Sequence, residues 1–194
     1  MKLTNVGIRI NGNRELNKML SKQKIKKPEI ATIKYIQSGE IAIGSKNELL
    51  VSSPLGTCVA VMAYDAKTKI CGMAHIMLPG KSHIENALHK NRYAADAIDD
   101  LLSKLHQAGV PSENIDICLA GGANVLKKEN DTISTELAAS VFKIIGEKKL
   151  KIRATSLGGY ERRIASLNPE TGAAYYTIGE STELVLWKFG IKKG

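Results

Sequence analysis

A cysteine and a histidine, Cys58 and His75, stand on either side of a predicted β-hairpin. Apolar and β-branched residues fill positions 59–64 and 70–78, and the polar stretch 65–69 between them indicates a turn. With a two-residue loop at positions 66 and 67, the register places Cys58 directly opposite His75, with both side chains on one face. An imidazole in that place can take the thiol proton and leave a nucleophilic thiolate. The spacing therefore suggests cysteine-nucleophile chemistry.

Spacing alone does not separate catalysis from packing, because a free cysteine is often buried as a small apolar group. Cys71 and Cys118 lie within apolar runs, and we expect them only to pack. Three cysteines are an odd number, and the N-terminal residues show no secretory-signal pattern. The sequence therefore predicts reduced thiols and a cytoplasmic location.

Two sequence motifs around Cys58 and His75 carry more information than the spacing of the two residues. Residues 52–61 read Ser-Ser-Pro-Leu-Gly-Thr-Cys-Val-Ala-Val, and residues 72–79 read Gly-Met-Ala-His-Ile-Met-Leu-Pro. Their content, order and separation resemble the CheD family of bacterial chemotaxis proteins, and similar words extend the resemblance from about Thr32 to about Glu180. The resemblance implies a chemoreceptor glutamine deamidase with a Cys-His-Thr catalytic set.

Carried over by position, the resemblance makes Cys58 the nucleophile and His75 the general base. The threonine of the family falls on Ser52, whose hydroxyl would orient the imidazole. Glu136 stands where the family has an arginine, and Ser156 stands where it has an aspartate. These two changes bear on substrate recognition more than on the chemistry.

Three loops are expected to approach the substrate. Their residues are Gly56, Thr57, Gly121, Gly122, Gly158 and Gly159. Glycine lets a backbone come close to a ligand, but a tight turn after a strand needs it equally, and both roles stay open. Neither glycine pair forms a GxxxxGK[ST] or GxGxxG word, so nucleotide binding has little support. The four histidines are scattered and no CxxC or HExxH word occurs, so we expect no metal and no cofactor.

The implied reaction is hydrolysis of a glutamine side chain to glutamate through a thioester on Cys58, with His75 moving the protons. The expected substrate is the helical bundle of a chemoreceptor's cytoplasmic part. Two alternatives stay open. One is a largely non-catalytic regulator that binds and stimulates a CheC-type phosphatase, which the resemblance also implies. The other is a cysteine amidase with another substrate.

Positive charge is concentrated at the start of the chain. Of the formal net charge of +9, residues 1–30 carry +6, from eight Lys or Arg and two Glu. We expect a basic extension here, as a solvated or mobile tail or as a contact with an acidic partner, and a single CheD-like domain over 31–194. These lysines have no aromatic residues among them, and no apolar run reaches the ~18–20 residues that span a bilayer. Neither nucleic-acid binding nor membrane insertion is therefore expected.

The hydrophobic pattern predicts more strands than helices. Alternating or short apolar runs indicate strands near residues 32–36, 40–43, 59–64, 70–78, 115–120, 151–156, 163–167, 173–178 and 184–189. Apolar residues at helical spacing indicate helices over 93–108 and 135–147. Because hairpins dominate, we predict an α+β fold. The resemblance implies a layered α-β-β sandwich, with mostly antiparallel or mixed sheets and two main helices packed on one face.

Overall fold

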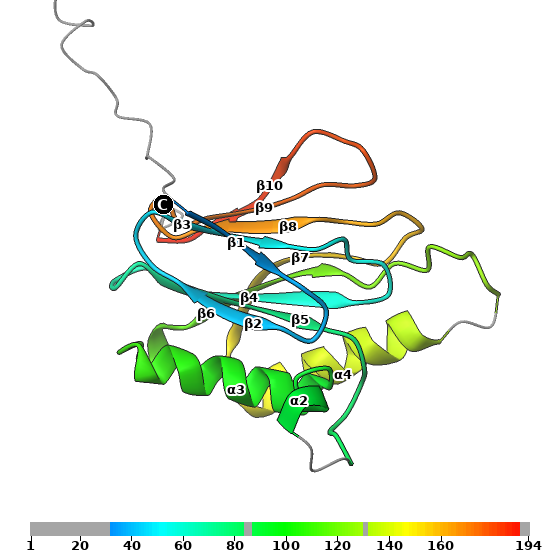
Figure 1. The fold of residues 1–194 in the computed structure, drawn as a ribbon, viewed down its shortest axis with the longest axis horizontal. Helices are drawn as coiled ribbons and strands as arrows, with labels where there is room; N and C mark the ends of the chain where they lie inside the picture. Colours follow the sequence, from blue (N-terminus) through cyan, green and yellow to red (C-terminus); the bar gives the residue numbers. More distant parts are fainter. Residues whose placement is uncertain (1–31, 84–86, 130–131, 191–194) are drawn as a thin grey trace, which may run out of the picture.

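Three layers form the part of the chain that the computed structural model describes, which is residues 32–83, 87–129 and 132–190. Two five-stranded sheets lie face to face, and two long helices cover the outer side of one sheet (Figure 1). The strands are β1 (Thr32–Ile36), β2 (Ile41–Gly44), β3 (Glu48–Ser52), β4 (Val59–Asp65), β5 (Ile70–Ile76), β6 (Asp116–Gly121), β7 (Lys151–Leu157), β8 (Ala165–Asn168), β9 (Ala173–Tyr176) and β10 (Leu184–Lys188). The helices are α2 (Ala87–Lys90), α3 (Ala94–Gln107) and α4 (Ile133–Glu147). The extension predicted for residues 1–30 lies outside the described residues.

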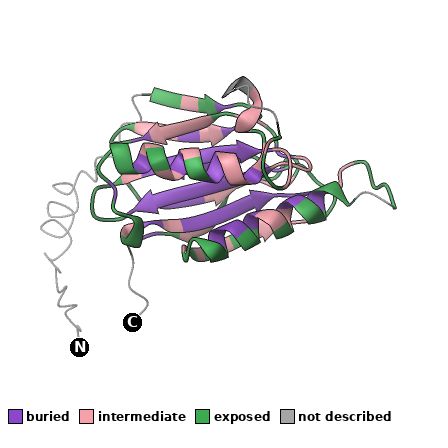
Figure 2. Cartoon of the chain, turned by 90° about the horizontal axis from the view of Figure 1, so that it is seen from below, coloured by how far each residue is buried: buried purple, intermediate pink, exposed green. Residues whose placement is uncertain are grey.

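Both sheets are mixed. The first sheet has the strand order β1-β3-β8-β9-β10, and the second has the order β2-β5-β4-β6-β7. Each contains one parallel pair, β1 with β3 and β6 with β7. α4 connects β6 to β7, since a parallel pair needs a long crossover. α3 and α4 lie across the outer face of the second sheet (Figure 2). The predicted α-β-β arrangement is thus confirmed.

β4 lies at the centre of the second sheet and is buried on both faces. Val59 and Val61 pack in the layer between this sheet and the helices. Ala60 and Met62 pack in the layer between the two sheets. An uninterrupted apolar run suits a strand that is covered on both sides. β4 therefore separates a helix-facing core from an inter-sheet core.

The hairpin of β4 and β5 has a longer loop than predicted. Its loop covers residues 66–69, and the register pairs Ala60, not Cys58, with His75. The Asp65 carboxylate accepts hydrogen bonds from a backbone N–H and a hydroxyl of this loop, both at 2.9 Å, and so stabilises the extra residues. The prediction of a two-residue loop was therefore wrong. Because the register shifts by two residues, alternation still keeps positions 58 and 75 on one face.

The other predicted elements are confirmed with small shifts at their ends. α3 and α4 correspond to the helices expected over 93–108 and 135–147, and β6 to β10 correspond to the five later predicted strands. β3 and α2 were not predicted, because each is short and lacks a clear periodic pattern. Within the described residues, no helix has both the length and the apolar character that crossing a membrane requires.

Candidate active site

Cys58 ends the loop that joins β3 to β4. Two backbone hydrogen bonds tie this loop to the end of β6, because the Gly122 N–H donates to the Cys58 carbonyl and the Ala123 N–H donates to the Gly56 carbonyl, both at 2.8 Å. Gly121 has a φ of 119°, and a Cβ there would collide with the Cys58 carbonyl oxygen. Glycine at 121 is therefore required by the close approach of the cysteine's own backbone.

The Cys58 side chain is half-buried, whereas Cys71 and Cys118 are fully buried between the two sheets. The packing role expected for Cys71 and Cys118 is thus confirmed. Burial raises the pKa of the Cys58 thiol, and hydrogen bonds with its own backbone N–H, Ser38 and Thr57 lower it. Burial raises the pKa values of Cys71 and Cys118 to about 12. Of the three thiols, Cys58 is the one with solvent access.

The His75 ring is fully buried, and both of its nitrogens have partners. Nδ1 lies 3.2 Å from the Ser53 hydroxyl and 3.4 Å from the Ile36 carbonyl oxygen. Nε2 lies 3.4 Å from the Ser38 hydroxyl. Burial lowers the pKa of His75, and the Ile36 carbonyl and the charge of Glu40 oppose this shift. The imidazole is therefore neutral at pH 7 and able to accept a proton.

The two pKa shifts describe a neutral pair at rest. A raised thiol pKa and a lowered imidazole pKa both disfavour a thiolate beside an imidazolium. Between the described side chains of Cys58 and His75 there is no direct hydrogen bond, and the Ser38 hydroxyl lies 3.4 Å from Nε2 of the ring. The thiol must therefore lose its proton as it reacts, rather than beforehand.

Ser52 does not make the contact with the imidazole that its position suggested. Its hydroxyl accepts a hydrogen bond from the Ala165 N–H at 2.9 Å and is buried between β3 and β8. Ser53, the next residue, holds Nδ1 of His75 instead. Ser53, rather than Ser52, reaches the ring because β3 ends at Ser52. The chain turns there, so the two neighbouring side chains point to different places. Sequence reasoning missed Ser53 and Ser38, although a second serine beside Ser52 was a signal for the first.

Arg163 joins the two glycine turns. Its side chain is 7% exposed, and its Nη1 donates to the carbonyls of Gly158 at 2.8 Å and Gly121 at 3.5 Å. Its Nε donates to the Ser156 hydroxyl at 2.9 Å. Ser156 therefore supports the loops around the cysteine. Glu136 is exposed in the first turn of α4.

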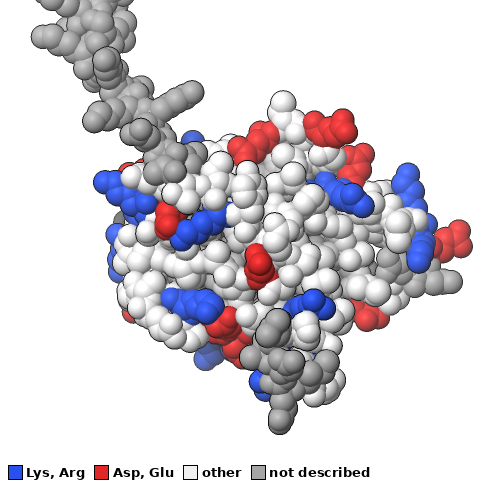
Figure 3. All heavy atoms as spheres, viewed as in Figure 1, with Lys and Arg blue, Asp and Glu red and all other residues white. Residues whose placement is uncertain are grey.

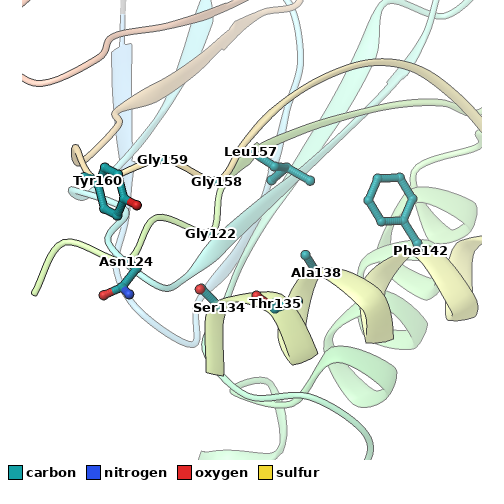
Figure 4. A pocket seen from close by; sticks show the side chains of 10 residues that line it. All are labelled: Gly122, Asn124, Ser134, Thr135, Ala138, Phe142, Leu157, Gly158, Gly159 and Tyr160. Atoms are coloured by element: carbon teal, nitrogen blue, oxygen red, sulfur yellow. The ribbon is translucent and has the colours of Figure 1, made fainter. Parts of the chain in front are cut away.

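A groove of about 480 Å³ lies where β6 and β7 end, beside the first turns of α4 (Figure 4). Its lining residues are Gly122, Asn124, Ser134, Thr135, Ala138, Phe142, Leu157, Gly158, Gly159 and Tyr160. Ser134 and Asn124 give one part of it polar groups, and the Phe142 ring stands at the other end (Figure 4). Neither Cys58 nor His75 lines it. The groove therefore borders the loop that carries Cys58, through the hydrogen bond of Gly122 to the cysteine carbonyl, and does not include the thiol.

Figure 3 shows positive and negative side chains spread among one another on one face, with uncharged surface between them. A group of three or more His, Cys, Asp or Glu side chains suited to a metal ion is absent from the described ranges.

Comparison with known proteins places the chain in a family. The sequence model described as CheD chemotactic sensory transduction matches residues 77–177, a range that begins just after β5. A protein of Chlorobium luteolum named "Probable chemoreceptor glutamine deamidase CheD" is 40% identical over 152 residues, which cover 78% of this chain and 76% of that protein. A "CheD 2" of the same description from Methanosarcina acetivorans is 36% identical over 154 residues, covering 77% and 66%. A Methanococcus maripaludis relative, again named a probable chemoreceptor glutamine deamidase, is 30% identical over 155 residues, covering 77% and 97%. The chain belongs to the CheD family, as its sequence resemblance predicted.

Proposed function

We propose that this protein is a glutamine deamidase that converts glutamine side chains of chemoreceptors to glutamate and releases ammonia. The names of its relatives support the substrate class. The observation that carries the proposal is the placement of the half-buried Cys58 thiol on the same sheet face as the buried, neutral imidazole of His75. That arrangement supplies a nucleophile and a base that takes its proton only when the nucleophile attacks.

In the first half of the reaction, the Cys58 sulfur attacks the amide carbon while its proton passes to His75. The C–N bond then breaks, His75 returns the proton to the departing nitrogen, and ammonia leaves a thioester on Cys58. In the second half, His75 takes a proton from water as the oxygen attacks the thioester. The C–S bond breaks, the proton returns to the sulfur, and the product is a glutamate side chain.

The negative oxygen of each tetrahedral intermediate needs hydrogen-bond donors. The backbone N–H of Cys58 lies at the bend that begins with Gly56 and Thr57, and we assign it this role. The loop is held rigid by its bonds to Gly122 and Ala123, so the donor is fixed before the substrate arrives. Such preorganisation is what makes a donor effective in the transition state.

The groove beside α4 is the proposed seat for the receptor surface around the target glutamine. Gly122, Gly158 and Gly159 leave its floor without side chains, and Tyr160 and Phe142 are exposed on its rim by 61% and 41%. Exposed aromatic side chains are enriched where proteins bind one another. We place the reaction in the cytoplasm, where the receptor bundle is accessible.

The test is deamidation of a receptor cytoplasmic fragment, read by mass spectrometry as a gain of about 1 Da per converted glutamine. We expect conversion by the wild type and none by Cys58→Ala. Cys118→Ala is the matched control, because it removes a buried thiol from the same inter-sheet core. Conversion that persists in Cys58→Ala at the wild-type rate would rule out the nucleophile. Absence of conversion with several receptors would rule out the substrate class.

A second function, binding to a CheC-type phosphatase, is favoured by the position of the groove outside the catalytic pair. A partner seated there would not need Cys58. We expect Cys58→Ala to keep such a partner in a pull-down and Tyr160→Ala to lose it. Equal retention by both variants would argue against the groove as its seat.

A further inference from the structure

The outer face of the first sheet carries a row of side chains that crosses all five strands. Backbone pairing in the order β1-β3-β8-β9-β10 aligns Tyr35, Val51, Ser166, Tyr175 and Val185. Their neighbours along the strands, such as Leu50 and Ala174, pack in the core between the two sheets. Because successive side chains of a strand alternate between faces, the row points away from the second sheet.

This outer face is apolar and open. Ile33 and Leu49 form a second outward-facing pair beside the row. Tyr35 is 63% exposed, Val185 is 55% exposed and Ile33 is 46% exposed. The two long helices pack on the second sheet, and none of the described helices lies on the outer side of the first (Figure 1). Exposed apolar patches of this kind mark surfaces that another group covers.

The chain that precedes β1 is joined to the edge of this face. β1 is an edge strand of the first sheet, and its residues 33 and 35 belong to the face. The preceding segment is basic, but its sequence also contains regularly spaced apolar positions, which indicate packing against an apolar surface. Val6, Ile8 and Ile10 follow a two-residue period, and Leu16, Met19 and Leu20 have the spacing of one helical face.

The length of this segment allows it to cover the whole face. Residues 21–31 separate Leu20 from β1, and 11 extended residues span about 36 Å at ~3.3 Å each. Neighbouring strands lie ~4.8 Å apart, so the five strands are about 20 Å across. Leu20 can therefore reach every strand. Because the segment is attached to the sheet, its effective concentration there is high, which favours it over a second copy of the chain.

We propose that the chain before β1 folds back over the outer face of the first sheet and covers the row with its apolar residues. The lysines and arginines between those residues then stay in water, so the cover buries apolar surface without burying charge. The first sheet gains a cover on its outer side, as α3 and α4 already give the second sheet. The inference uses neither Cys58 nor the groove, so it is independent of the proposed deamidation.

Two tyrosines of matching exposure give the test an internal reference. Tyr35 lies on the proposed docking face and is 63% exposed, and Tyr160 lies on the rim of the groove and is 61% exposed. Hydroxyl radicals should oxidise the two side chains at similar rates if nothing covers the face. In the full chain, footprinting read by mass spectrometry should show Tyr35 oxidised several-fold more slowly than Tyr160. Equal rates would overturn the proposal.

A triple variant tests whether the segment provides this protection. Leu16→Asp, Met19→Asp and Leu20→Asp together should raise the oxidation rate of Tyr35 to that of Tyr160, because a carboxylate cannot be buried against an apolar face without a large cost. Protection of Tyr35 that survives in this variant overturns the proposal. Protection that fades on dilution, with a dimer seen by sedimentation, assigns the face to a second copy of the chain and overturns it too.

The matched control adds the same charge to polar positions of the segment. Asn17→Asp, Ser21→Asp and Gln23→Asp together introduce three carboxylates and leave every apolar residue in place. We expect Tyr35 to stay protected in this variant. Loss of protection here as well would show that charge, rather than apolar contact, governs the cover, and would contradict the proposed packing.

Discussion

The Ser53 hydroxyl lies 3.2 Å from Nδ1 of His75, while the adjacent Ser52 hydroxyl is engaged by the Ala165 N–H. Ser53 therefore contacts the imidazole, whereas Ser52 accepts a backbone hydrogen bond from β8. We predict that Ser53→Ala lowers kcat by about 10- to 100-fold, because an imidazole that loses a partner is oriented less well. KM and the melting temperature should change little, since Ser53 is not fully buried.

Ser52→Ala is the paired variant. It leaves a buried backbone N–H of β8 without its acceptor, which costs about 1–3 kcal/mol of unfolding free energy. We expect a lower denaturant midpoint with kcat near that of the wild type. A large loss of kcat in Ser52→Ala without loss of stability would return the catalytic role to Ser52.

The pH dependence follows from the direction of the two shifts. Burial lowers the pKa of His75, so the ring stays neutral below the usual imidazole value of about 6.5. Deamidation should therefore persist as the pH falls through 6.5 and fail only at the lower pKa of the folded state. Steady-state rates from pH 4.5 to pH 8 measure this limb. An acid limb above 6.5 would contradict the neutral ring.

The same shift predicts a stability change. The unfolded chain binds a proton at His75 below pH of about 6.5 more readily than the folded protein does. As the pH falls from about 6.5 to the lower folded pKa, the free energy of unfolding should therefore decrease. Above pH of about 6.5, His75 should not affect it. His75→Gln lacks the titration, so the difference between its denaturation curves and those of the wild type isolates this effect. A wild-type advantage in stability over His75→Gln that shrinks as the pH rises through this window would have the wrong sign.

Much of the fold could be predicted because its signals are local. The apolar run of β4 indicates a strand that is buried on both faces, and the apolar spacing of α3 indicates a helix with one buried face. Both elements were predicted correctly. The placement of Cys58 and His75 on one sheet face was also predicted from the sequence, through alternation across the hairpin. These features depend on residues that lie close to one another in the sequence.

The contacts across the sheets could not be predicted in the same way. The loop length of the β4–β5 hairpin depended on how the Asp65 carboxylate was used, and nothing local separates the two registers. Ser38 reaches His75 over 37 positions, and Ser53 over 22. Such contacts require knowing that β1 and β3 lie in one sheet above β5, which is a property of the whole topology.

Gly121 offers a direct test of the loop that holds the nucleophile. A methyl group there meets the Cys58 carbonyl oxygen at a positive φ, so Gly121→Ala should lower the free energy of unfolding by about 3 kcal/mol. Alkylation of Cys58 should also change, because its backbone must move. Gly146→Ala is the matched control: this glycine is in α4 with open space around it, and alanine there should stabilise by up to ~1 kcal/mol. Equal effects of both substitutions would show that the close approach is not required.

Arg163 provides the last prediction. It is 7% exposed, burial lowers its pKa, and the described residues include no carboxylate within ion-pair distance of it. Its Nε binds the Ser156 hydroxyl, so Ser156→Asp would put a carboxylate against the guanidinium. We predict a gain of about 1 kcal/mol, which raises the melting temperature of a chain of this size by roughly 2–4 °C.

Thr155→Asp is the control for Ser156→Asp, because it adds the same charge at the neighbouring, exposed position of β7. It should change the melting temperature by less than Ser156→Asp does. In Arg163→Ala, Ser156→Asp should lose its benefit, since the new carboxylate then has no partner. A double-mutant cycle measured by thermal unfolding gives the coupling directly. Zero coupling would mean that the guanidinium is satisfied by the glycine carbonyls alone, and that the serine at 156 is not what keeps the two turns together.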